Sequence, residues 1–262
     1  EFALGPEQAK LKKGERILIH SAAGGVGIAA IQYAQRVGAE VYATASAPKH
    51  DFLRSLGVKH ISTSRDPVQF KTEMKEMVGD RGVDVVLNSL TSDGYIDATV
   101  SLVAQNGRFI EIGKRNIWTK EEMAAKRPDI YYETHSLNEL LPAEPDKLVP
   151  MLNDLTASVD AKYARPLPMS VFEMRGELVD AFRSLQGGKN IGKVVVRVEP
   201  TPSSSPLYAG DGAVLVTGGL GGLGIVTAEV FVELGAKCVV LASRSGKIKY
   251  DDQGLGDLLD EL

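Results

Sequence analysis

The 262-residue sequence has few metal-ligating residues and no segment long enough to cross a membrane. It contains one cysteine and four histidines that are far apart, so a zinc site with clustered ligands is not expected. A single cysteine also excludes a disulfide framework, which suits a reducing, cytoplasmic compartment. No apolar run approaches the roughly 18 residues of a membrane span, and no signal peptide is recognisable. We therefore expect a cytoplasmic protein that binds neither metal nor membrane.

The sequence also has no excess of basic residues over acidic ones. There are 30 Lys and Arg residues against 34 Asp and Glu, a net charge of −4, so no surface for nucleic acid is expected. Hydrophobic residues make up 44% of the chain, which is ample for buried cores. Cys238 stands in an apolar run and is expected to be buried as a small hydrophobic residue. The chain begins at Glu1 without a methionine, shortly before a core strand, and we interpret it as a piece of a larger protein.

A glycine-rich turn follows the first apolar run. Residues 17–19 are β-branched or leucine, as a buried strand requires. The motif Ala22-x-Gly24-x-x-Gly27 comes next and matches the dinucleotide-binding fingerprint, with alanine in its first place. The small residues of this motif allow a tight turn and let the backbone approach a pyrophosphate. The pattern therefore predicts a nucleotide site, with an ordinary glycine turn as the alternative.

The helix after this turn is expected over residues 26–37, with Gly38 as its C-cap. Its first N–H groups would bind an anion, and we assign Gly25 and Val26 to the same phosphate site. The helix face expected to pack on the sheet has apolar residues three and four positions apart. These residues are Val26, Ala29, Ala30, Tyr33, Ala34 and Val37.

The end of the second predicted strand, residues 41–44, indicates the choice of cofactor. A chain selective for NADH carries Asp or Glu there, where the adenosine ribose binds. This sequence has Ser46 instead, with Lys49 three residues later. A hydroxyl group and a cation suit a 2′-phosphate, which an acid would repel. The sequence therefore favours NADPH, the alternative being a solvent-exposed serine and lysine.

Strands and helices then alternate, which predicts an α/β fold with a doubly wound parallel sheet of the Rossmann type. Ligands of such sheets bind at the carboxyl ends of the strands. We expect helices over residues 51–56, 68–78, 95–104, 146–159 and 177–185, and strands over 58–61, 84–87, 108–112, 130–133 and 191–198, with an extended segment over 165–170. Strand ends place further residues around the cofactor crevice. They are Asn88, Ser89, Leu90, Gly113 and Lys114.

The opening pattern recurs near the C-terminal end, after a segment rich in proline, serine and glycine. Gly27 and Gly224, Gly38 and Gly235, and Ser46 and Ser243 are each 197 positions apart. The repeat predicts a strand over residues 213–217, a helix over 225–234 and a strand over 239–242, hence a second nucleotide-binding βαβ unit. Its predicted cofactor residues are Gly218, Gly222, Leu223, Gly224 and Arg244, the last as a phosphate partner.

These patterns divide the chain into four parts. We expect a nucleotide-binding domain over residues 1–164, a returning piece of a substrate-binding domain over 165–198, a linker over 199–212 and a domain fragment over 213–262.

Hydride transfer fits the residues better than the other reactions considered. No Gly-x-Ser-x-Gly elbow for acyl hydrolysis is present. Hydride transfer needs a held nicotinamide, an acceptor and a proton source. Lys114 is the candidate proton source, at the end of a central strand where partial burial would suit it. A solvated loop lysine, or a phosphate contact, is the alternative for this residue.

The sequence resembles the enoylreductase domain of modular polyketide synthases and animal fatty acid synthase. This domain belongs to the zinc-free, quinone-reductase-like medium-chain dehydrogenases. The resemblance covers about residues 5–198 and lies in five motifs that occur in order. They are residues 17–27, Thr44-Ala45-Ser46 with Lys49, 84–90, 108–114 and 192–196. Residues 217–224 with Ser243-Arg244 resemble the start of a ketoreductase domain of the short-chain dehydrogenase type.

The resemblance implies NADPH-dependent reduction of the double bond of a trans-2-enoyl thioester carried by acyl carrier protein. The family's lysine falls on Lys114, and Lys193 in the last enoylreductase motif is assigned to the cofactor site. The family's aspartate falls on Ser136, which is a departure, and His135 beside it could donate a proton. The implied partners are the carrier protein and other domains of the synthase, with dimerisation through the parent synthase.

The resemblance also implies that most of the substrate-binding domain and the catalytic residues of the ketoreductase lie outside this sequence. We therefore expect the 262-residue chain to bind NADPH but to reduce enoyl thioesters poorly.

Three other functions stay open. A free-standing quinone reductase is one, although the second glycine motif argues against it. A noncatalytic NADPH-binding module is another, favoured if Ser136 marks decay. An S-adenosylmethionine methyltransferase would need an acid after the second strand, which both units lack.

Overall fold

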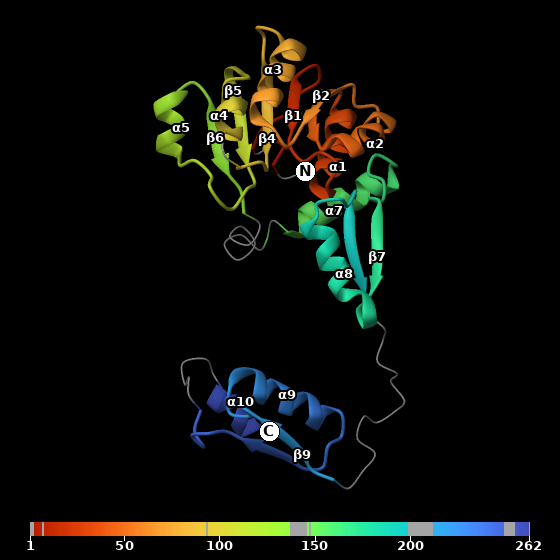
Figure 1. Cartoon of the computed structure of the whole chain (residues 1–262), viewed down its shortest axis with the longest axis vertical. Helices are drawn as coiled ribbons and strands as arrows, with labels where there is room; N and C mark the ends of the chain where they lie inside the picture. Colours follow the sequence, from red (N-terminus) through yellow and green to blue (C-terminus); the bar gives the residue numbers. More distant parts are fainter. Residues whose placement is uncertain are drawn as a thin grey trace. The chain divides into compact units, whose positions relative to one another are not determined.

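The structure is a computed structural model that describes residues 3–6, 8–92, 94–136, 146, 148–198, 212–248 and 255–261. Backbone contacts divide the chain into two compact units, residues 1–197 and 198–262, which are described separately (Figure 1). The predicted linker over residues 199–212 lies outside the described residues, apart from Gly212.

The first unit contains a six-stranded parallel sheet in the order β3-β2-β1-β4-β5-β6. This order, with parallel pairing throughout, confirms the predicted doubly wound fold. Its strands are β1 (Arg16–Ile19), β2 (Glu40–Ala45), β3 (His60–Thr63), β4 (Val83–Asn88), β5 (Val103–Glu111) and β6 (Tyr131–Thr134). The helices and the single 3₁₀ turn between them are α1 (Gly25–Val37), η1 (Ala47–Lys49), α2 (His50–Ser55), α3 (Pro67–Val78), α4 (Tyr95–Val100) and α5 (Lys120–Lys126).

The sheet buries apolar side chains on both faces. Because side chains alternate along a strand, Ile17 and Ile19 of β1 join the cluster with α1 and α2, whereas Leu18 joins the cluster with α3 and α4. The same alternation holds in β4, where Val85 and Val86 belong to opposite clusters. Figure 1 shows the strands between these groups of helices. Helices thus cover both faces of the sheet, and this packing holds the strand ends in place.

The buried face of α1 agrees with the predicted one at Ala30 and Ala34, which are buried, and at Tyr33 and Val37, which pack against the core, but differs at the start of the helix. Val26 is 56% exposed and Ala29 is also exposed, whereas Ile28 and Ile31 are buried. The reason is the tight start of the helix. A Cβ atom at Gly27 would lie 2.5 Å from the Cα atom of Ala22, so this glycine lies against the turn and sets which face meets the sheet.

One further expectation for this region was wrong, and one helix was not predicted. The helix expected over residues 95–104 ends at Val100, and β5 begins at Val103. The ladder between β4 and β5 skips from Val103 to Arg108, so the intervening residues bulge outwards, with Asn106 in the left-handed region. Helix α5 was not predicted, although Thr119 and Glu122 form a capping box at its start, and this pattern is a usable sequence signal.

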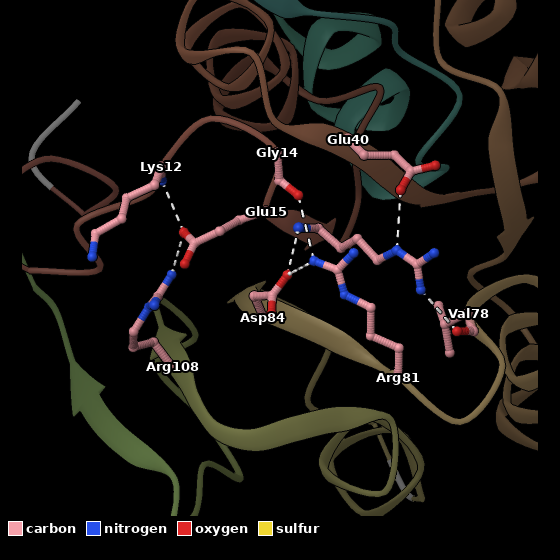
Figure 2. Close-up of polar contacts among 9 residues, drawn as sticks. Lys12, Gly14, Glu15, Glu40, Val78, Arg81, Asp84 and Arg108 are labelled. Carbon is pink, nitrogen blue, oxygen red and sulfur yellow. Dashed lines mark hydrogen bonds and ion pairs between the residues drawn. The ribbon is translucent and has the colours of Figure 1, made fainter.

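Charged side chains tie the amino ends of the strands together (Figure 2). Arg108 pairs with Glu15 at 2.5 Å, and both side chains are only about one-fifth exposed. The backbone N–H of Arg16 donates to Asp84 at 2.8 Å. The guanidinium group of Arg16 pairs with Glu40. This network lies at the edge opposite to the carboxyl ends of the strands, so it stabilises the sheet without occupying the ligand-binding edge.

The remainder of the first unit comprises a helix and a small parallel sheet with its own helix. These are α7 (Leu148–Asp160), β7 (Met169–Glu173), α8 (Met174–Gln186) and β8 (Lys193–Arg197). The predicted extended segment over 165–170 overlaps β7 only at its end, because the strand runs on to residue 173. Val171 and Phe182 are exposed, whereas Phe172 is partly buried.

The second unit has the predicted strand–helix–strand order. Its described elements are β9 (Val214–Thr217), α9 (Gly222–Glu233), β10 (Val239–Ala242) and α10 (Leu255–Glu261), and β9 and β10 pair in parallel. Cys238 is exposed, contrary to expectation, because it precedes β10 rather than lying within it.

Candidate functional site

The fingerprint turn connects the carboxyl end of β1 to the first turn of α1. Ser21 has a left-handed backbone with φ of 51°, and Gly24 then caps the helix with its N–H bound to the carbonyl of Ser21 at 2.9 Å. The first N–H groups of the helix, from Gly25 onwards, have no partners within it. The close approach of Gly27 to Ala22 explains why this position needs glycine. The turn therefore offers the N–H groups and the space that a pyrophosphate requires.

A pocket of about 260 Å³ opens beside this turn at the ends of β2 and β3. It contains predicted cofactor residues from three separate segments: Gly24, Ser46, Lys49 and Leu90. Ser21 and Ala23 of the predicted turn line it as well. The sequence reasoning did not assign the remaining lining residues, which are Ala45, Ser64, Arg65, Gly188 and Asn190.

Two cations line this pocket. Burial lowers the pKa of Lys49, and the positive charge of Arg65 lowers it further. The Nζ atom of Lys49 donates to the carbonyl of Asn190 at 2.8 Å, which fixes the position of the ammonium group. Arg65 was missed by the sequence reasoning, although it is the second residue after β3, and the strand-end rule that singled out Ser46 applies to this segment too. Two cations and three serine hydroxyl groups make this pocket suitable for a phosphate.

The small parallel sheet meets the fingerprint turn at Gly192. The N–H of Gly192 donates to the carbonyl of Ala23 at 2.8 Å, and a bridge joins Gly192 to Gly24. The next side chain, Lys193, passes over Gly25, where a Cβ atom would lie 2.6 Å from its Cε atom. The predicted cofactor residue Lys193 therefore lies at the phosphate turn, although the two segments are far apart in sequence.

A buried carboxyl group underlies the predicted nicotinamide end of the site. Glu111, at the end of β5, accepts hydrogen bonds from Asn88 Nδ2 at 2.5 Å and from the N–H of Gly113 at 2.6 Å. Burial raises the pKa of Glu111, and these hydrogen bonds oppose that shift. A side chain at position 113 would collide with Glu111 and Thr91. Glu111 was not predicted, although an acid within the apolar run 109–112 is a signal for a buried functional group.

The other predicted residues at this edge are less enclosed. The Oγ atom of Ser89 donates to the carbonyl of His20 at 3.3 Å, and Ser89 is partly buried. Lys114 follows Gly113 and is exposed, contrary to the expected partial burial, because it lies three residues beyond the end of β5.

His135 and Ser136 directly follow β6. The N–H of His135 donates to the carbonyl of Glu111 at 2.8 Å, so these residues lie beside the end of β5. Burial lowers the pKa of His135, and the charge of Glu133 opposes this shift. Both side chains are partly buried. The structure thus places the three predicted catalytic residues on the ends of two neighbouring strands.

His20 is buried directly beneath the fingerprint turn. Its ring nitrogens lie 3.0 Å from Thr44 Oγ1 and 2.9 Å from Thr99 Oγ1, and burial lowers its pKa from 6.5 to about 3. The ring packs against Phe70 and Tyr95. Two hydroxyl groups and two aromatic rings therefore fix the position of the imidazole.

The low pKa of His20 predicts that acid destabilises the first unit. Below pH 6.5 the unfolded chain binds a proton that the folded chain rejects, so stability falls as the pH drops toward about 3. We expect a slope of up to about 1.4 kcal/mol per pH unit in this range. Urea unfolding followed by the fluorescence of Trp118, the one tryptophan, measures it, and His20→Asn should lose this part of the slope. His50→Asn is the matched control, and an equal slope for His20→Asn and the unmodified chain would contradict the prediction.

The second unit repeats the geometry of the first turn. Gly218 stands 197 positions after Ser21 and has φ of 71°, and Gly221 corresponds to the capping Gly24. A Cβ atom at Gly224 would lie 2.5 Å from Cα of Gly219, as in the first unit. Of the other predicted residues here, Gly222 begins α9 and Leu223 is 88% exposed.

The constant offset does not extend to the second strand of the repeat. Ile19 pairs with Ala43 in the first unit, whereas Val216 pairs with Leu241 in the second, which is an offset of 198. One extra residue before β10 causes this shift. By register, Arg244 rather than Ser243 corresponds to Ser46, and Arg244 is exposed.

Comparisons with known proteins agree with these two units. Residues 25–141 match the zinc-binding dehydrogenase family, and residues 212–262 match the KR domain family. A pikromycin polyketide synthase component of Streptomyces venezuelae, PikAII, is 40% identical over 97% of this chain and 6% of its own length. The solved CurK enoyl reductase is 44% identical with a TM-score of 0.70, over 75% of this chain and 59% of that one.

Of these three proteins, the nucleotide-binding subdomain of the enoylreductase domain of PpsC from Mycobacterium tuberculosis is matched over the largest share of its own length. It is 36% identical with a TM-score of 0.54, over 60% of this chain and 88% of that one. The chain belongs to the enoyl reductase domains of polyketide synthases. Within this chain, the enoyl reductase part is followed by residues that match the KR domain family, in the predicted order.

In the part of this chain that the structure describes, no three or more His, Cys, Asp or Glu residues are grouped so that they could hold a metal ion. These residues do not fit the zinc site that the family's description implies. No described helix has the length and apolar character to span a bilayer.

Proposed function

We propose that this chain is the cofactor-binding part of an NADPH-dependent enoyl reductase that acts on a trans-2-enoyl thioester. The pocket at the ends of β2 and β3 carries this proposal. It joins the fingerprint turn to Ser46, Lys49 and Arg65, with no acid among its lining residues. Because an acid binds the ribose of NADH and repels a 2′-phosphate, this set of residues favours NADPH.

The phosphate end of the cofactor would be held by the turn at Gly24 and Gly25 together with Lys193. The nicotinamide end would lie toward Asn88 and Ser89 at the end of β4, which is next to β1, and toward Gly113 after the adjacent strand β5. When bound there, the cofactor supplies a hydride to the β-carbon of the substrate.

The remaining chemistry is a proton transfer from this chain. The resulting enolate takes a proton at its α-carbon, and Lys114 is the proposed donor. Its exposed side chain is free to reach a substrate above the strand ends. His135 and Ser136 would assist, because they follow the neighbouring strand β6. Ser136 stands where the family's aspartate is expected, so His135 is the better partner for the lysine.

The second fingerprint, with Gly218, Gly222, Leu223 and Gly224, is proposed as the start of a second NADPH site. Arg244 would contact the phosphate, since it corresponds to Ser46 by strand register. We further propose the domain limits given above, with acyl carrier protein and neighbouring synthase domains as partners. The KR match over residues 212–262 speaks against a free-standing quinone reductase.

A fluorescence titration of the 262-residue chain with NADPH and with NADH tests the choice of cofactor. Reduction of an enoyl thioester by the full domain, followed by NADPH absorbance, tests the reaction. We expect saturable binding of NADPH at the first unit. Absence of binding by the chain would refute the site, whereas binding without reduction in the full domain would favour a noncatalytic NADPH-binding module.

A further inference from the structure

The hydrogen bonds of the His20 ring with Thr44 and Thr99 can have only one donor–acceptor direction. Thr99 donates its hydroxyl hydrogen to the carbonyl of Tyr95 at 2.7 Å, so it can only accept from the ring of His20. The Nε2 atom of His20 must therefore carry the hydrogen. In a neutral ring, Nδ1 is then an acceptor, and it receives the hydroxyl hydrogen of Thr44.

This chain of bonds ends on the fingerprint turn. With its hydrogen given to His20, Thr44 Oγ1 accepts the backbone N–H of Ser21 at 3.3 Å, while the carbonyl of Thr44 accepts the N–H of Ala22 at 2.9 Å. His20, Thr44 and Thr99 are all at most 3% exposed, so water cannot replace these partners. Ser21 is the residue with the left-handed backbone, which is strained for any residue with a side chain.

We propose that His20 is a positioning residue for the dinucleotide site, acting through Thr44 to hold Ser21 in its left-handed conformation. This inference rests on the proposed binding of NADPH by the first unit. Its consequence is that the direction of the turn, and of the free N–H groups at the start of α1, depends on a neutral, buried imidazole that touches no cofactor.

The second unit provides an internal comparison. Gly218 takes the place of Ser21 and adopts the same conformation without strain, since it lacks a Cβ atom. Ala242 takes the place of Thr44, because it accepts the N–H of Gly219 at 3.0 Å as Thr44 accepts that of Ala22. Alanine has no hydroxyl group to hold the turn. The unit with glycine therefore lacks the relay of hydrogen bonds from Thr99 through His20 and Thr44 to Ser21 that the unit with serine possesses.

This comparison leads to a direct test by paired substitutions in the full chain. Thr44→Val removes the hydroxyl group at nearly constant shape, and we expect it to weaken NADPH binding about three- to tenfold. Thr44→Ser retains the hydroxyl and should bind within about twofold of the unmodified chain. With Ser21→Gly in the background, Thr44→Val should have little further effect, because glycine needs no support. Thr72→Val, on the exposed side of α3, is the matched control for loss of a threonine hydroxyl.

Two measurements without cofactor separate this inference from the proposed function. NMR of the ring nitrogens of His20 should show the hydrogen on Nε2, and amide exchange at Ser21 should be faster in Thr44→Val than in Thr44→Ser. Failure of the unmodified chain to bind NADPH would refute the proposed site, and with it the cofactor role of His20. The relay itself is overturned by a hydrogen on Nδ1, by unchanged exchange at Ser21, or by an equal loss of NADPH affinity with serine or glycine at position 21. Thermal unfolding of each variant establishes that it is folded.

Discussion

Lys114→Ala is expected to slow enoyl reduction by roughly 10²–10⁴-fold in the full enoyl reductase domain, because it removes the proposed general acid. The affinity for NADPH should change little, since the pocket cations lie at the ends of other strands. Steady-state kinetics with NADPH absorbance give both quantities. Lys71→Ala, on the exposed side of α3, is the matched control for loss of a surface lysine.

The opposite pattern would assign Lys114 a different role. If Lys114→Ala weakens NADPH binding and leaves turnover at saturation intact, this lysine contacts the cofactor and is not the acid. Ser136→Asp extends the test, because it restores the carboxylate that the family carries beside the lysine. A faster reaction would show that the serine weakens the site, and an unchanged rate would favour His135 or water as the partner.

Lys49→Ala combined with Arg65→Ala is expected to abolish the preference for NADPH over NADH. Each charge-assisted contact with a phosphate is worth about 1.5–3 kcal/mol, and the lower end applies to Arg65 because it is exposed. Lys49→Ala alone should leave part of the preference, since Arg65 lines the same pocket. From the sequence, Lys49 but not Arg65 was assigned to the 2′-phosphate.

Fluorescence titrations with both cofactors measure this preference. Arg54→Ala is the matched control, because Arg54 is an exposed cation that pairs with Asp51 on the neighbouring helix α2. The preference of the unmodified chain should weaken at high salt, which screens the phosphate contact. Equal affinity of the unmodified chain for NADPH and NADH would contradict the assignment of the pocket to a 2′-phosphate.

Much of the fold could be predicted because its signals are local. The alternation of apolar runs with helical periodicity, and the glycines at Gly24, Gly27 and Gly38, depend only on residues close in sequence. These signals placed the strands to within a few residues, and the five ordered motifs indicated the family. Where local signals were mixed, as over residues 95–104, the predicted helix was too long, because the ladder with β4 decides where β5 begins.

The amino-acid sequence by itself determined the doubly wound sheet, its two fingerprint turns and the absence of an acid after the second strand of each unit. Only the tertiary structure placed Arg65 beside Lys49, Glu111 beneath Asn88 and Gly113, and His20 between Thr44 and Thr99. These groups come from different strands and helices, and their contacts depend on sheet register and burial. Neither quantity is encoded in residues that are neighbours in the chain, because register and burial arise only when distant segments pack together.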